Sequence, residues 1–485
     1  MLSRIFPILL LVACLPEFDP GLLDADLRDA ASPDTSADSD VGGDVGHDVG
    51  DDVSEPVDAA TDATDATDAG PAPFTFRPSN LSAELFMEAE TLFEDASPLV
   101  VSADEVLVLD SDNGTAWLYP SLAAATLGET RAGVTPPRDG AEEQSVATIR
   151  TSQDVIDGTT QNAPDIRFFL LTSLTIEANG LVLGVGTLAL GIGARDQIEV
   201  AGHLSVGAAV LGLPLPRPGA INDTGWQGAG NVPPTLNAGF GPSPGGSGGS
   251  FGLPGGEGGG GGGKGQPDYA GAPSGVTYGN ENLEPLVGGA LGGSAGLPCE
   301  FEGQEELGLG GGALQLFAPL LRVSGFITAG GGGGRTGYEY YDGQCQAAND
   351  YSGGGVGGGS GGALLLEADT VNVTGILSVA GGGGSRGGRG TGRDAPQSGL
   401  RGDESGGGTG GGRQPGAVAD GTAGRGGDGG GVVAAGAGEE LGNGGGGGGG
   451  GGRIRINSRT SDVAPGALIP RSGTAAASAG ALHPR

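Results

Sequence analysis

The chain has 485 residues, 108 of them glycine, and a formal net charge of −35 from 58 acidic and 23 basic side chains. This charge excludes a basic nucleic-acid-binding surface, because polyanions would be repelled. The glycines stand in runs such as 258–263 and 444–452 and not at every third position, which excludes a collagen triple helix.

The first fourteen residues are typical of a bacterial export signal, in which Arg4 precedes an apolar run too short to span a bilayer. The run ends in Leu11-Val12-Ala13-Cys14, which resembles a lipobox. We therefore expect residues 1–13 to be a lipoprotein signal peptide and the lipid on Cys14 to bind the membrane. Because Leu15 and not Asp follows, we expect an outer-membrane, surface-exposed lipoprotein of the cell envelope. The alternative is an ordinary secretory signal in which Cys14 is incidental.

Residues 14–73 are expected to be the lipidated cysteine and a disordered acidic linker. Between residues 15 and 70 the chain carries seventeen acidic side chains and one basic side chain, Arg28. Such a segment repels itself and buries too little apolar surface to fold. Calcium ligation by these aspartates is the alternative, although they lack the spacing of a defined calcium loop.

Residues 74–218 are expected to form an N-terminal β region and the first coils of a solenoid. Three apolar, β-branched runs predict strands: 99–101, 106–109 and 146–149. The sequence Ile176-Glu177-Ala178-Asn179-Gly180 recurs 22 residues later as Ile198-Glu199-Val200-Ala201-Gly202. A period in the twenties is typical of a solenoid, so we predict an all-β fold, a parallel β-helix.

A hairpin motif follows the run at 106–109. Residues 110–117 resemble an Asp-box through Asp112, Gly114 and Trp117, with Asp110 in place of the usual Ser or Thr. Asn113-Gly114 is a strong tight-turn signal, so we interpret the motif as structural.

Residues 219–452 contain 86 of the 108 glycines, interrupted by strand units. Leu314 and Gly325 define one unit, which recurs 50 residues later at Leu364 and Gly375. The coils are therefore expected to continue, with long glycine-rich loops inserted between them, and 453–485 to be the terminal coil and tail. The loops are either disordered, because glycine has the largest backbone entropy, or packed as hydrogen-bonded polyglycine helices.

The whole pattern resembles the glycine-rich surface lipoproteins of myxobacterial type. The likeness rests on the motif at Cys14, the acidic linker, the 22-residue repeat, and the units Gly361–Gly375 and Gly451–Asn457. It implies a surface location and a β-solenoid, and it transfers no catalytic residues.

Two features of the glycine-rich region are candidate sites. Cys299 and Cys345 form an even pair in an oxidising compartment, and we predict a disulfide, with two free thiols as the alternative. Tyr338, Tyr340 and Tyr341 are a candidate contact surface for a glycan or protein ligand, with packing over the solenoid as the alternative.

No catalytic, metal or cofactor site is expected. Gly-x-Ser-x-Gly occurs at Ser247, Ser294 and Ser360, but without the strand and helix of a nucleophile elbow. We expect a non-enzymatic surface protein with a structural or adhesive role and no nucleic-acid partner. The alternative is a β-helix polysaccharide lyase or glycoside hydrolase, whose candidate residues on one face are Asp196, Glu199, Arg322, Glu367 and Asp369.

Overall fold

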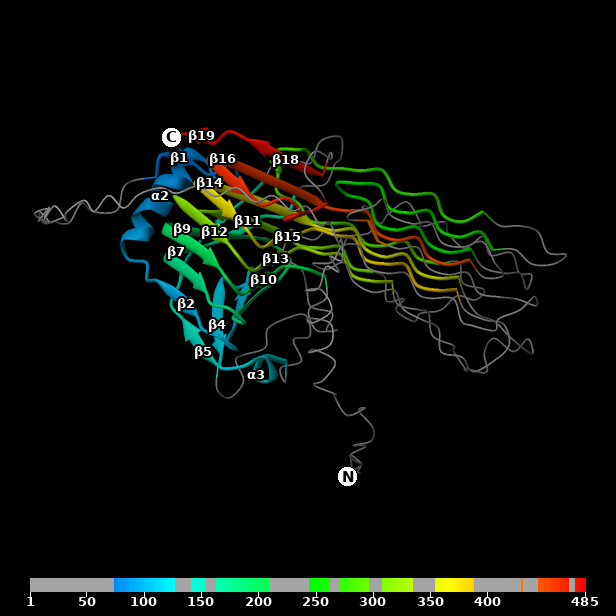
Figure 1. Cartoon of the computed structure of the whole chain (residues 1–485), viewed down its shortest axis with the longest axis horizontal. Coiled ribbons are helices and arrows are strands. Elements are labelled where there is room, and N and C mark those ends of the chain that lie inside the picture. The colour runs from blue at the N-terminus through cyan, green and yellow to red at the C-terminus, as the bar shows by residue number, and fades with distance from the viewer. Residues whose placement is uncertain are drawn as a thin grey trace, which may run out of the picture. The chain divides into compact units, whose positions relative to one another are not determined.

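The computed structural model describes residues 74–126, 141–153, 163–208, 244–261, 270–295, 308–334, 354–387, 429–430, 444–470 and 476–485. Of the described residues, 40% lie in strands and 6% in helices, so the fold is all-β as expected. Two sheets form the body of the protein (Figure 1).

Sheet 1 carries the long strands. Its order is β18 (Ala477–Gly480), β16 (Arg453–Val463), β14 (Ala363–Val373), β11 (Ala313–Phe317), β9 (Ala189–Val200), β7 (Ile166–Ile176) and β2 (Leu99–Val101). Two further strands lie off this path: β12 (Leu320–Val323), between β14 and β9, and β6 (Ala147–Thr151), antiparallel to β7. All other neighbours in sheet 1 are parallel.

Sheet 2 carries shorter strands. Its order is β17 (Leu468–Ile469), β15 (Ile376–Ser378), β13 (Phe326–Thr328), β10 (His203–Ser205), β8 (Leu181–Val185), β3 (Val106–Asp110), β4 (Thr115–Tyr119) and β5 (Glu142–Gln144). Only the pairs that β4 makes are antiparallel. The remaining elements are the antiparallel pair β1 (Phe76–Arg77) and β19 (His483–Pro484), and the helices α2 (Ala83–Glu94) and α3 (Leu122–Thr126).

The main core lies between the two sheets. One ladder of inward side chains crosses four neighbouring strands of sheet 1: Leu190, Leu314, Leu364 and Ile454. The predicted 50-residue spacing is confirmed, because Leu314 pairs with Leu364 and Phe326 pairs with Ile376. Parallel strands with apolar side chains in register bury a continuous interior.

The predicted 22-residue period holds for the strands that follow the turns at 177–180 and 201–202, but not for the strands that precede them. Leu181 pairs with His203, 22 residues on, but Ile176 pairs with Val200 and not with Ile198. The turn at 177–180 is two residues longer than the turn at 201–202, and this difference shifts the register of the preceding strand.

The predicted hairpin at 110–117 is present and has a structural role. Gly114 turns with φ +70° between β3 and β4, and Asp110 accepts hydrogen bonds from the amides of Asp112 (2.9 Å) and Asn113 (3.2 Å). The carboxylate of Asp112 accepts from the amide and the hydroxyl of Thr187, both at 2.7 Å. The motif therefore ties the hairpin to the chain that enters β9.

Helix α2 was not among the predicted elements, although its signals are local. Ser82 caps the helix by accepting from the amide of Leu85 at 3.2 Å, and Phe86, Ala89 and Phe93 fall on one buried face. These side chains belong to a second core, on the outer face of sheet 1, together with Phe317 and Leu365.

The described glycine-rich segments form an ordered bundle, here called the glycine array. Extended segments run side by side from the end of the body opposite α2 (Figure 1). The segments are 206–208, 244–250, 254–261, 270–277, 287–295, 308–312, 329–334, 354–362, 379–387 and 444–452. Segments that follow a sheet 2 strand along the chain run away from the body, and segments that precede a sheet 1 strand run back toward it. The array therefore continues both sheets.

Hydrogen bonds in the array repeat every three residues. Gly446 and Gly449 donate their amides to the carbonyls of Ser385 and Gly382, whereas Gly447 and Gly450 donate to a different segment, 246–249. Each residue of a threefold extended helix faces another neighbour, which is the geometry of packed polyglycine helices. For the described segments, the ordered alternative is therefore confirmed.

Candidate functional site

The most connected polar cluster lies on the outer face of sheet 1 and is centred on Glu367 of β14. Glu367 stands in register between Phe317 of β11 and Asn457 of β16. Its neighbours in sequence, Leu366 and Ala368, belong to the main core, so the Glu367 side chain points outward. Residues 74–82, here called the strap, cross this face, and Glu367 has an exposed fraction of 0%.

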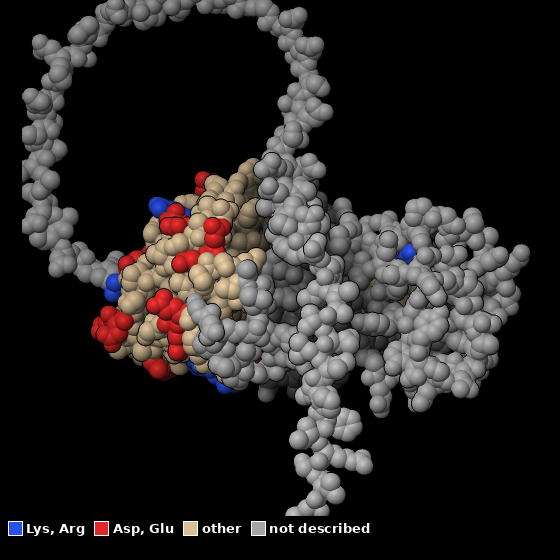
Figure 2. All heavy atoms as spheres, turned by 90° about the horizontal axis from the view of Figure 1, so that it is seen from below, with Lys and Arg blue, Asp and Glu red and all other residues tan. Residues whose placement is uncertain are grey.

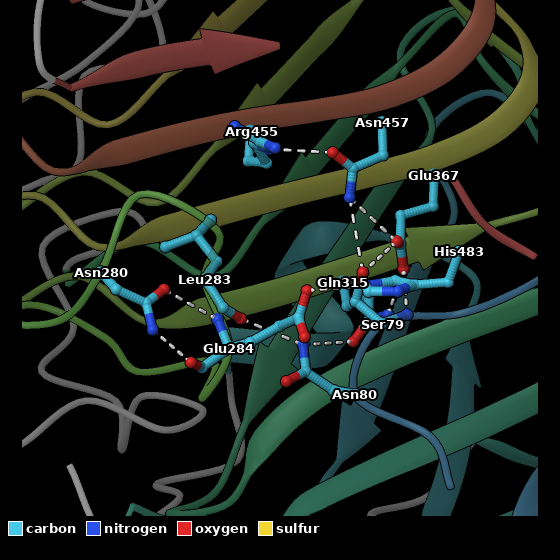
Figure 3. Close-up of polar contacts among 10 residues, drawn as sticks. All are labelled: Ser79, Asn80, Asn280, Leu283, Glu284, Gln315, Glu367, Arg455, Asn457 and His483. Carbon is cyan, nitrogen blue, oxygen red and sulfur yellow. Dashed lines mark hydrogen bonds and ion pairs between the residues drawn. The ribbon is translucent and has the colours of Figure 1, made fainter. Parts of the chain in front are cut away.

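Four donors converge on the Glu367 carboxylate (Figure 3). The Ser79 amide and the Gln315 Nε2 donate to Oε2, at 3.0 and 2.6 Å. The Ser79 hydroxyl and the Asn457 Nδ2 contact Oε1, at 2.5 and 3.1 Å. A buried carboxylate is tolerated when such bonds replace its hydration.

Further contacts orient the two amide side chains. Arg455 Nε donates to Asn457 Oδ1 at 2.8 Å, which directs the Asn457 amide nitrogen toward Glu367. Asn80 Nδ2 donates to Gln315 Oε1 at 3.1 Å and so directs the Gln315 nitrogen to the same carboxylate. Because both amides are fixed as donors, the cluster is built around an acceptor.

Burial raises the pKa of Glu367 above its ordinary value, and the hydrogen bonds from Ser79, Asn457 and Gln315 oppose this shift. The Ser79 hydroxyl can donate to the ionised carboxylate or accept from the protonated one. The Ser79 hydroxyl is therefore a hydrogen-bond partner for either form of Glu367.

The two ends of the described body meet beside this cluster. Arg485 forms an ion pair with Glu90 at 2.8 Å and donates to the carbonyl of Phe74 at 3.1 Å. His483 lies 3.0 Å from a carboxylate oxygen of Glu284, next to the pairing of β1 with β19. The C-terminal residues thereby close over the strap.

The five candidates for polysaccharide cleavage fall into separate groups. Glu367 and Asp369 both contact the strap, and Asp369 also pairs with Arg459 at 3.2 Å. Glu199 and Arg322 are neighbours across β9 and β12, and Asp196 pairs with Arg195 at 3.3 Å. The carboxyl of Glu367, whose pKa is raised by burial, is sealed from solvent.

The serines of the Gly-x-Ser-x-Gly matches lie in the glycine array. Ser247 and Ser360 are fully buried, and the Ser360 hydroxyl accepts from the amide of Ala290 at 2.8 Å. Ser294 belongs to the extended segment 287–295. All three stand in extended backbone and not in the strand-turn-helix of a nucleophile elbow.

The other sequence-predicted site residues lie outside the described part of the chain. These are Cys14, Cys299, Cys345, Tyr338, Tyr340 and Tyr341. Within the described part, no group of three or more His, Cys, Asp or Glu side chains could hold a metal ion. Neither described helix combines the length and the apolar character that crossing a membrane requires.

Comparison with protein-family models, curated proteins and solved structures finds no match.

Sequence reasoning missed the partners of Glu367. Gln315, Arg455 and Asn457 are polar residues at alternate positions of apolar strands, a pattern that ordinarily predicts exposure on the outer face. Ser79 gave no signal beyond a turn-forming residue. Only the position of the strap shows that these side chains meet under a cover.

Proposed function

We propose that this chain is an exported, lipid-anchored surface protein with a structural or adhesive role, whose body is a parallel β-helix. The β-helix is supported by the repeated path from a sheet 1 strand through a short turn to a sheet 2 strand. This path recurs from β7 to β8, from β9 to β10 and from β14 to β15, with parallel pairing of successive repeats. Glycines close these turns by tight stacking, as Gly375 does on Gly325.

The glycine array is the observation that carries the proposal. Its segment 354–362 spans roughly 28 Å at the rise of about 3.1 Å per residue of a threefold helix. Each segment forms hydrogen bonds with neighbouring segments on more than one side, so the array is stiffer than a flexible glycine linker. The segments 329–334 and 354–362 belong to this array, and the sequence that joins them includes the candidate contact residues Tyr338, Tyr340 and Tyr341.

The charge of the body limits which class of ligand it can bind. Acidic side chains predominate on the face of the body shown in Figure 2. A polyanionic partner would be repelled there, which favours a neutral glycan or a protein ligand.

The anchor is tested by the substitution Cys14→Ser in the full chain. We expect the protein to leave the membrane fraction and to lose protease accessibility at the surface of intact cells. A Cys299→Ser variant is the matched control and should remain in membranes. Persistence of the Cys14→Ser protein in membranes would contradict the lipid anchor.

The adhesive role is tested with a variant in which Tyr338, Tyr340 and Tyr341 are replaced by serine. Cells that display this variant at wild-type level should attach several-fold less to a glycan or protein matrix than cells with the unaltered chain. Replacement of the exposed Val276 by serine serves as the control. Equal attachment by all three cell types would oppose a contact role for these tyrosines.

A further inference from the structure

The strap follows the acidic linker directly along the chain. If Cys14 holds the protein to a membrane, as proposed above, any pull between membrane and body enters the body at Phe74. The contacts of residues 74–82 therefore decide how that pull is resisted.

The first part of the strap is held by aromatic packing. Phe74 and Phe76 are buried, with exposed fractions of 3% and 0%. The Phe74 ring lies 5.4 Å from that of Phe93 of α2 and 5.8 Å from that of Phe317 of β11. Aromatic pairs at such separations add to the free energy of burial.

The strap is also held along its length by polar contacts to three strands of sheet 1. Ser79 binds Glu367 of β14, and Asn80 binds Gln315 of β11. The carbonyl of Thr75 accepts from Arg459 of β16 at 3.2 Å, and its hydroxyl donates to Asp369. Strands that pair in parallel with neighbours on both sides share such a load across the sheet.

We propose that residues 74–82 form the junction that transmits force from the linker to the β body, and that the bonds from Ser79 to Glu367 resist its release. Phe74 and the pair β1–β19 meet the load first, because they stand nearest the linker. The Ser79 bonds are the last polar contacts to strand β14 before α2 begins at Ala83. When they hold, the main core between the two sheets remains unloaded.

Magnetic tweezers on the purified full chain test this junction. One handle is attached at the N-terminus and the other at Thr374, an exposed turn residue between β14 and β15. The rate of the first short extension is compared at constant force for the wild type, Ser79→Ala, Glu367→Gln and the exposed control Glu88→Gln. Loss of one buried hydrogen bond to Glu367 predicts about a tenfold faster release for Ser79→Ala, with Glu88→Gln unchanged.

Two results would overturn the proposal: equal release rates for all four proteins, or unfolding of the β body before the strap is released. Glu367→Gln keeps the shape of the side chain and should also release faster, because one donor then faces the new amide nitrogen. The measurement uses purified protein and is independent of lipidation. Failure of the lipid anchor is seen separately, by fractionation of Cys14→Ser.

Discussion

Gly361 packs against the main chain of Val379, so that a Cβ on Gly361 would lie closer than 3.0 Å to the Val379 carbonyl oxygen. The two residues belong to segments that lead into β14 and out of β15. A separation below 3.0 Å is not shown by real Cβ atoms, so this approach requires glycine. The glycine runs are thus packing positions of the array.

Gly361→Ala should destabilise the protein by about 2 kcal/mol or more, because backbone must move to admit the methyl group. Gly451 is the matched control in the neighbouring inward segment, since the nearest atom to its Cβ would be the flexible end of Leu253 at 3.2 Å and the other contacts would be ordinary ones. Gly451→Ala should change stability by less than about 0.5 kcal/mol. Thermal unfolding measures both, and equal effects would contradict close packing at Gly361.

The pH dependence of stability should report on Glu367. Burial raises its pKa in the folded protein, so between the ordinary and the raised pKa the folded state binds more protons than the unfolded state. The stabilising contribution of this group is therefore complete below the ordinary pKa and is lost as the pH rises through the folded pKa.

The measurement is the difference in unfolding free energy between the wild type and Glu367→Gln from pH 4 to pH 8. The difference should shift in favour of the wild type as the pH falls. A difference independent of pH would show that Glu367 titrates equally in the folded and unfolded chains.

Asn457→Asp should place a second carboxylate against Glu367 in a buried site. Arg455 compensates part of the new charge, but the substitution removes the donor to Glu367 and sets two carboxylates against each other. We therefore expect a loss of about 2 kcal/mol at pH 7, and partial recovery at pH 5 as the pair takes up a proton. Asn372→Asp makes the same change at a half-buried position of β14 and should have little effect. Denaturant unfolding of both variants decides between a specific and a general effect of charge.

Asp112→Ala should loosen the chain that enters β9. The substitution removes the acceptor for the amides of Thr187 (2.7 Å) and Leu188 (3.3 Å) and should cost about 1–2 kcal/mol. Faster hydrogen exchange at these two amides is the expected signature. Exchange there should stay unchanged in Glu143→Ala, which alters an exposed carboxylate on β5.

The disulfide between Cys299 and Cys345 remains a prediction, and the array gives it geometric support. Gly308 accepts from the amide of Gly292 and donates to the carbonyl of Gly357, so the segments that flank both cysteines are neighbours. Peptide mapping without reduction should yield one cross-linked peptide. Closing a loop of this length is worth roughly 4 kcal/mol, so reduction should lower the unfolding temperature. Two separate thiol peptides would refute the pairing.

The sequence by itself determined several strands, the 50-residue spacing and the hairpin turn, because these depend on local alternation and on single turn residues such as Gly114. The 22-residue spacing held only after the turn, for Leu181 and His203. The similar patterns around Leu314 and Leu364 predicted that these two units pair, since similar patterns place similar side chains in the core. Helix α2 was also readable from the Ser82 cap and the spacing of Phe86 and Phe93, although it was not predicted.

Only the tertiary structure decided that the glycine segments are ordered and that Glu367 is buried. A glycine run has the same composition in a flexible linker and in the glycine array. The two differ in the hydrogen bonds to segments that are distant in sequence. In the same way, Ser79 reaches a carboxylate 288 residues away. A contact of that range leaves no local pattern, because the covering segment is supplied by the fold.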